Sequence, residues 1–177
     1  MQKINGKIQG RKAFTLIELL VVVAIIGILA AVGVVAYNGY TGAAKVNVVK
    51  SNQNLAYKTI SAELLKCELG EEKVLIAWEG YPGGVPGNLP CVLQNGQGYS
   101  NTHASTVAIN FFEDIKNPYE TNQTAARSGD VIKDSDVGYL NFTTAETSGQ
   151  KFIVISSCFK TPCSQDSNRL ETTITVR

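Results

Sequence analysis

The sequence lacks the residue combinations on which most catalytic sites depend. Its 177 residues include a single histidine, His103, which lies in a polar stretch without a recognisable nucleophile motif. General-base catalysis needs a titratable group within reach of a substrate proton, and covalent catalysis needs a nucleophile beside such a group. There is also no glycine-rich phosphate-binding loop that ends in lysine. We therefore expect a protein that is not an enzyme and that carries no cofactor.

Cysteine is scarce, and its spacing argues against a zinc site. The four cysteines, at Cys67, Cys91, Cys158 and Cys163, include no Cys-x-x-Cys pair, the spacing typical of zinc ligands. In an oxidising compartment they could form two disulfides, and four cysteines allow three pairings. Sequence alone does not choose between the pairings. We favour Cys67 with Cys91 and Cys158 with Cys163, because each pair is local along the chain.

Acidic residues are clustered at only one place that could hold a metal. Asp130, Asp134 and Asp136 could supply oxygen ligands to calcium, but their spacing is not that of an EF-hand loop. A solvated turn before a strand is the better interpretation. We therefore treat the three aspartates as weak calcium candidates only.

Charge is missing from a long segment near the N-terminus. No charged residue occurs from Leu19 to Tyr37. A helix from Phe14 to Tyr37 would be about 36 Å long at 1.5 Å per residue, which is enough to cross a bilayer. The segment before it carries no acid and four cations: Lys3, Lys7, Arg11 and Lys12. The positive-inside rule leaves these cations in the cytoplasm and places the rest of the chain on the other side of the membrane.

One acid lies inside this apolar run. Glu18 would cost about 2.5–3.5 kcal/mol or more at the centre of a membrane helix, so it should have a purpose and a cationic partner. The run itself has neither lysine nor arginine. The cation that could lie at that depth is a new α-amino group, which cleavage between Ala13 and Phe14 would create.

These features resemble the type IV prepilins and the related pseudopilins, with their class III signal and N-terminal methylation motif. The shared pattern is a short basic leader, a small residue, Phe-Thr-Leu-Ile-Glu from Phe14 to Glu18, and an apolar helix. The resemblance implies that a prepilin peptidase cuts between Ala13 and Phe14 and methylates the new amine. It also implies that Glu18 neutralises the Phe14 amine of a neighbouring subunit during assembly. The family usually has glycine before the cut, where this chain has the similarly small Ala13.

The remaining pattern predicts an α+β fold. One helix is expected from Phe14 to Leu69, and Gly70 is a natural stop. Its second half is amphipathic, with one face formed at three- and four-residue steps by Val46, Val49, Gln53, Ala56, Ile60, Leu64 and Cys67. Strand-like runs at 137–143, 151–158 and 170–176 predict an antiparallel sheet, and 107–115 favours a short helix. A long N-terminal helix packed on such a sheet is also the pilin architecture.

These expectations divide the chain into four parts. Residues 1–13 are a basic leader that is removed, and residues 14–37 are a transmembrane and filament-core helix. Residues 38–69 are an amphipathic helix that continues into a globular head at 70–177. The head contains a long connection at about 70–105, rich in turn formers, and a sheet with a C-terminal disulfide loop at about 137–177.

The function indicated is that of a major pilin, the structural subunit of a type IV pilus used for adhesion, motility or DNA uptake. The alternative is a pseudopilin of a type II secretion system, and a third class is a binding or enzymatic module on a membrane anchor, which would make no use of Glu18. The resemblance implies a helical homo-oligomer, an inner-membrane platform protein and an assembly ATPase. It places the subunit in the inner membrane before assembly and in an extracellular filament afterwards.

Two further observations concern the surface of the head. Removing four leader cations from the 16 in the chain leaves 12 against 15 acids, a net side-chain charge of −3, which does not suggest nonspecific nucleic-acid binding. Surface or DNA ligands of an assembled pilus remain open. Asn122-Gln123-Thr124 and Asn141-Phe142-Thr143 match the N-glycosylation pattern, although such short motifs also arise by chance.

Overall fold

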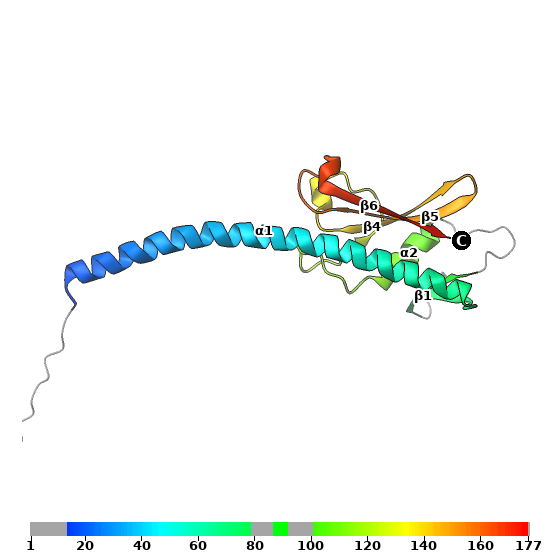
Figure 1. Ribbon diagram of the computed structural model, residues 1–177, viewed down its shortest axis with the longest axis horizontal. Helices are drawn as coiled ribbons and strands as arrows, with labels where there is room; N and C mark the ends of the chain where they lie inside the picture. The colour runs from blue at the N-terminus through cyan, green and yellow to red at the C-terminus, as the bar shows by residue number, and fades with distance from the viewer. Residues whose placement is uncertain (1–13, 79–86, 92–100, 177) are drawn as a thin grey trace, which may run out of the picture. The chain divides into compact units, whose positions relative to one another are not determined.

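The computed structural model describes residues 14–78, 87–91 and 101–176 (Figure 1). It contains two compact units, Met1–Thr41 and Gly42–Arg177. The helices are α1 (Leu16–Glu68), α2 (Asn101–Phe111) and the 3₁₀ turns η2 (Asp134–Asp136) and η3 (Asp166–Asn168). The strands are β1 (Lys73–Trp78), β2 (Gly87–Pro90), β3 (Ala126–Arg127), β4 (Leu140–Thr147), β5 (Gln150–Cys158) and β6 (Arg169–Val176).

Helix α1 confirms the long N-terminal helix expected from the sequence, within two residues at each end. No proline occurs along its length, so no backbone donor is lost. Gly70 ends it with a φ of +96°, a conformation that glycine adopts without steric penalty. The Gly70 N–H donates to Cys67 O at 3.2 Å and the Glu71 N–H donates to Lys66 O at 3.1 Å. This pair of bonds is a Schellman motif, which satisfies carbonyls left open at the helix end.

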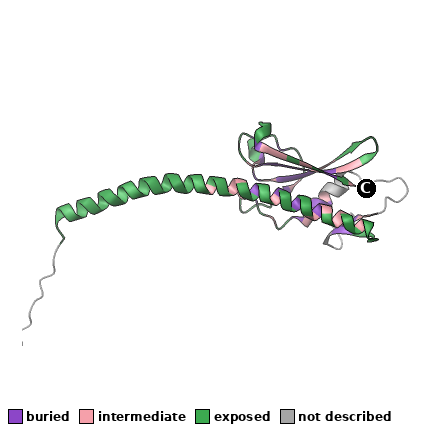
Figure 2. Ribbon diagram, in the orientation of Figure 1, coloured by how far each residue is buried: buried purple, intermediate pink, exposed green. Residues whose placement is uncertain are grey.

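The second half of α1 packs on the core of the second unit. Its buried residues are Val49, Gln53, Ala56 and Ile60, all members of the face predicted from the spacing (Figure 2). Ala56 and Ile60 join a cluster formed with buried side chains of α2 and the sheet, including Leu140, Phe142, Ile153, Ile155 and Ile174. Phe112 and Phe142 lie stacked in this cluster, with ring centroids 5.5 Å apart.

A buried amide links α1 to the sheet. The side-chain N–H of Gln53 donates to Ile155 O at 3.3 Å and to Thr172 Oγ1 at 3.0 Å, and Ser157 Oγ donates to Gln53 Oε1. Both Gln53 and Ser157 are almost fully buried. Because a buried amide is stable only when its hydrogen bonds are made, these contacts favour one register of the helix on the sheet.

The principal sheet has the order β3-β4-β5-β6. β4, β5 and β6 are antiparallel neighbours, which confirms the three predicted strands and the α+β layout. Ser148 and Gly149 join β4 to β5 with positive φ values of 53° and 78°, as a two-residue hairpin turn requires. β3 pairs in parallel with β4 through two residues, and the sequence gave no signal for so short a strand.

The region between Gly70 and residue 105 contains more structure than the long connection expected there. β1 and β2 pair as a two-stranded antiparallel sheet within it, so this part of the expectation was incomplete. Helix α2 confirms the short helix favoured for 107–115, but it begins at Asn101 and ends at Phe111. Leu75 and Leu89 of the small sheet are buried in the same core as α2 and β4, which ties the region to the head.

Candidate functional site

The start of α1 is built as a capping box. Thr15 precedes the first helical residue, and the Glu18 N–H donates to Thr15 Oγ1 at 3.3 Å. In return, the Thr15 N–H and Oγ1–H both donate to Glu18 Oε2 at 2.8 Å. This reciprocal arrangement satisfies donors that every helix leaves open at its N-terminus. The negative charge also lies in the first turn, where the helix dipole favours it.

The two oxygens of Glu18 are used unequally. Both hydrogen bonds from Thr15 reach Oε2, and Oε1 accepts none from the described residues. The carboxylate can therefore keep its cap and accept a second donor at the same time. Phe14, directly before the cap, is 86% exposed. Ala13, on the other side of the expected cleavage point, lies outside the described residues.

The first unit presents an exposed apolar helix. Every described side chain from Phe14 to Tyr40 is exposed (Figure 2). Within the described part of the chain, α1 is the one helix long and apolar enough to cross a membrane, judged by length and composition. Exposed apolar surface on this scale requires lipid or other protein to cover it. The capping box therefore begins a segment suited to either environment.

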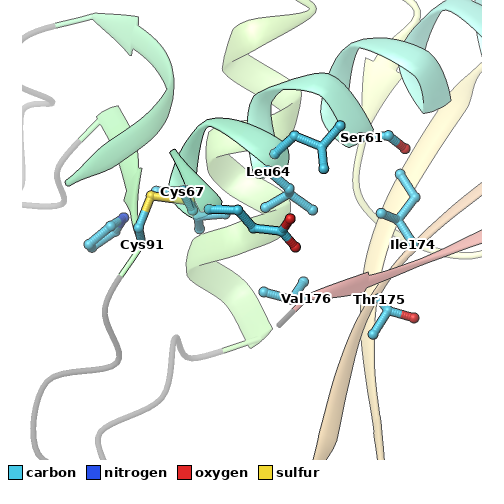
Figure 3. A pocket seen from close by; sticks show the side chains of 11 residues that line it. Ser61, Leu64, Cys67, Cys91, Ile174, Thr175 and Val176 are labelled. Atoms are coloured by element: carbon cyan, nitrogen blue, oxygen red, sulfur yellow. A yellow bond between two sulfur atoms is a disulfide. The ribbon is translucent and has the colours of Figure 1, made fainter. Parts of the chain in front are cut away.

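Two disulfides stabilise the second unit, with the pairing favoured from the sequence. Cys67 at the end of α1 is joined to Cys91 after β2, and Cys158 is joined to Cys163. Figure 3 shows the first bridge beside a cavity of about 470 Å³, which is also lined by Leu64 of α1 and by Ile174 and Val176 of β6. The bridge connects the end of α1 to the small sheet on one side of this cavity.

The three aspartates considered for calcium do not face a common point. Asp136 forms an ion pair with Arg127, and its Oδ2 accepts the Lys133 N–H at 2.7 Å. Asp134 Oδ1 accepts the Cys163 N–H at 2.8 Å, while Asp130 is exposed. Among the described residues, no group of three acidic, histidine or cysteine side chains is arranged to hold a metal.

The contacts of Asp136 lower the pKa of its carboxyl group. Burial raises the pKa of its carboxyl, but the Lys133 N–H and the Arg127 guanidinium outweigh burial and hold the pKa below its ordinary value. The carboxylate of Asp136, in η2, therefore links this turn to Arg127 of β3. The backbone at His103, which lies in a polar stretch of the sequence, belongs to helix α2.

Sequence reasoning missed Thr15. The signal was present, because Thr-x-x-Glu before an apolar run is the pattern of a capping box. The charge of Glu18 alone does not show how its side chain is held, so the prediction made from that charge did not include Thr15. The link from Gln53 to Ser157 was missed for a different reason: it joins residues 104 positions apart and has no local pattern.

Comparison with known proteins identifies the N-terminal segment. Residues 8–34 match the family model described as the prokaryotic N-terminal methylation motif. The resemblance to the type IV pilins is confirmed. This pilin-like chain is also 36% identical over 96 residues to the type IV major fimbrial protein FimA of Dichelobacter nodosus. That match covers 51% of the chain and 61% of the relative, so the chain spans about three fifths of the curated relative it matches. No solved structure matches this chain significantly.

Both matches support a pilin subunit. The motif covers the capping box, the expected cleavage point and most of the apolar segment.

Proposed function

We propose that this chain is the major pilin of a type IV pilus, a subunit that polymerises through the N-terminal half of α1 into a surface filament. The observation that carries the proposal is Glu18: a capped carboxylate with one open oxygen, at the start of an exposed, membrane-length apolar helix that carries the methylation motif. An anchor alone would not need an acid at this place.

The proposed mechanism begins in the membrane. Cleavage between Ala13 and Phe14 by a prepilin peptidase gives Phe14 a free amine, which the same enzyme methylates. The capping box survives this cut, because it involves only Thr15 and residues after it. In lipid, the carboxylate of Glu18 keeps two hydrogen bonds from its own helix and has no ammonium of a neighbouring subunit beside it.

Assembly supplies that cation. When the subunit moves from the bilayer into the filament, neighbouring helices replace lipid around the apolar side chains. The Phe14 ammonium of a neighbouring subunit then binds Glu18 through Oε1, while Oε2 keeps its bonds to Thr15. A charge pair away from water is stable only with good geometry and filled hydrogen bonds, so it selects one register between subunits. An assembly ATPase and an inner-membrane platform protein would drive extraction.

The test is intact-mass and N-terminal peptide mass spectrometry on protein sheared from the surface of the source cells. We expect a chain that starts at N-methylated Phe14 and shows the mass deficit of two disulfides. A mature chain found only in the membrane fraction would instead favour a pseudopilin of a type II secretion system. An intact leader on the exported protein would overturn the filament proposal.

A further inference from the structure

The two Asn-x-Thr motifs of the sequence occupy opposite environments in the fold. Asn141 lies in β4 and is fully buried, and its Oδ1 accepts a hydrogen bond from Arg127 Nε at 3.1 Å. Thr143, the third residue of that motif, is paired with Val154 in the sheet. A transferase could reach Asn141 only if the principal sheet opened.

The other motif lies on the surface, with Asn122 in a tight turn at the tip of a loop and Thr124 at the base of that loop. Asn122, Gln123 and Thr124 are all exposed, and the Asn122 side chain makes no hydrogen bond to the described residues. The Gln123 N–H donates to Glu120 O at 2.8 Å and closes a turn with Asn122 inside it. An isolated bridge between Lys116 and Thr124 closes the loop at its base.

The base of this loop is held firmly while its tip is open. Asn117 is buried, and its Nδ2 donates to Val137 O at 3.0 Å. Tyr119 Oη donates to Phe159 O at 2.7 Å, and Tyr139 Oη donates to Glu120 Oε2 at 2.9 Å. Such a base can present a side chain to a large partner without loss of core packing. A saccharide attached at the tip would extend into solvent.

We propose that Asn122 is an N-glycosylation site of the exported head and that Asn141, despite its matching motif, is not. The reaction takes place on the extracytoplasmic side, with an oligosaccharide carried on a lipid-linked diphosphate as the donor. The bond between C1 of the first sugar and the diphosphate oxygen breaks, and C1 bonds to Nδ2 of Asn122. The amide gives up one proton, and the lipid diphosphate leaves.

Two neighbours of Asn122 suit this reaction. Thr124 supplies the hydroxyl that the Asn-x-Thr pattern requires two residues after the asparagine. Glu120 adds an exposed carboxylate two residues before it, a charge that a basic groove on the transferase could recognise. The proposal requires only that the head is exported, so it does not depend on filament assembly.

Tryptic peptides of the full chain from the source cells give a direct test. Cleavage at lysine and arginine places Asn122 on residues 117–127 and Asn141 on residues 134–151, so the two motifs are read separately. We expect saccharide mass on 117–127, located at Asn122 by fragmentation, and an unmodified 134–151. An oxidised Cys158–Cys163 pair in the same sample shows that the head reached an oxidising compartment.

Matched variants separate recognition of the motif from damage to the loop. Asn122→Gln and Thr124→Val should remove the saccharide, whereas Thr124→Ser, which keeps the hydroxyl, should retain it. An unmodified 117–127 in exported protein with the oxidised pair would overturn the proposal. So would a saccharide on Asn141, or one on a serine or threonine of 117–127 that persists in Asn122→Gln.

Discussion

Glu18 both caps helix α1 and carries a negative charge. Replacing it with glutamine tests these two roles separately. A glutamine also completes a capping box, so Glu18→Gln can keep the bonds from Thr15 while it removes the charge. We expect Glu18→Gln to reduce sheared surface filaments about as severely as Glu18→Ala, by tenfold or more, because loss of one partner of a buried ion pair costs about 3–5 kcal/mol. The measurement is an immunoblot of sheared protein against the amount in the membrane.

Phe14→Ala provides the control for this comparison, because it removes the ring and keeps the amine. It should impair assembly less than Glu18→Ala. If Glu18→Gln assembled as well as the unmodified chain, capping alone would explain the acid and the proposed pairing with Phe14 would be wrong.

The lowered pKa of Asp136 predicts that this residue stabilises the head less at acidic pH. Its pKa is lowered in the folded state, so the carboxylate stabilises the head above the unfolded pKa of about 4, and this contribution is lost as pH falls through the folded pKa. At pH 7 we expect Asp136→Asn to lower the free energy of unfolding by about 1.5–3 kcal/mol, since hydrogen bonds to charged groups are worth about that much. The difference between the two proteins should shrink as the pH falls below the unfolded pKa, and it should vanish below the folded pKa.

Near-ultraviolet circular dichroism of the full chain in detergent would follow melting of the head as a function of pH. Asp130→Asn is the matched control, because Asp130 is exposed and forms no ion pair within the described residues. A difference between Asp136→Asn and the unmodified chain that stayed constant as the pH fell below about 4 would contradict the role given to the Asp136 charge.

Among the secondary-structure elements, α1 was the most predictable. Its apolar run, the spacing from Val46 to Cys67 and the stop at Gly70 are local signals, and all three appear in the structure. β4, β5 and β6 were predictable because each is long and rich in β-branched residues. β3 was not, since its two residues are positioned by pairing with a strand that comes later in the chain.

In the candidate site, too, local features could be predicted from the sequence and features that depend on distant residues could not. The acid, the expected cut before Phe14 and the capping box are all local patterns, although the capping box was not among the predictions. The environments of Asn122 and Asn141 could not, because identical local motifs differ only through the sheet around them. The contact of Gln53 with β5 and β6 also depends on residues far away in the sequence.

The Gln53 link predicts coupling between α1 and the sheet. Gln53→Leu should destabilise the head by about 1–3 kcal/mol, because it leaves buried polar groups without partners. Ser157→Ala should also destabilise, since Gln53 Oε1 then loses its donor. In the double variant we expect a loss smaller than the sum of the two, measured as melting temperatures of the full chain in detergent. Simple additivity would show that the two side chains act independently.

For the whole molecule, the proposed removal of the leader would reverse the sign of the net charge. The intact chain has a formal charge of +1 and a sequence pI of about 7.6, whereas loss of four leader cations leaves side chains with a net charge of −3. The processed chain should therefore focus on the acidic side of pH 7. Methylation of Phe14 leaves its amine able to carry a proton, so it should not reverse this shift.

Isoelectric focusing of denatured protein from the membrane and from sheared filaments would measure the shift. We expect filament protein to focus only at the acidic position and the membrane to contain both forms. An Ala13 variant that blocks cleavage should focus only near pH 7.6 and yield no filament protein. Filaments whose subunits focus near that value would show that assembly proceeds with the leader attached, and a Phe14 ammonium could not then be the cation that binds Glu18.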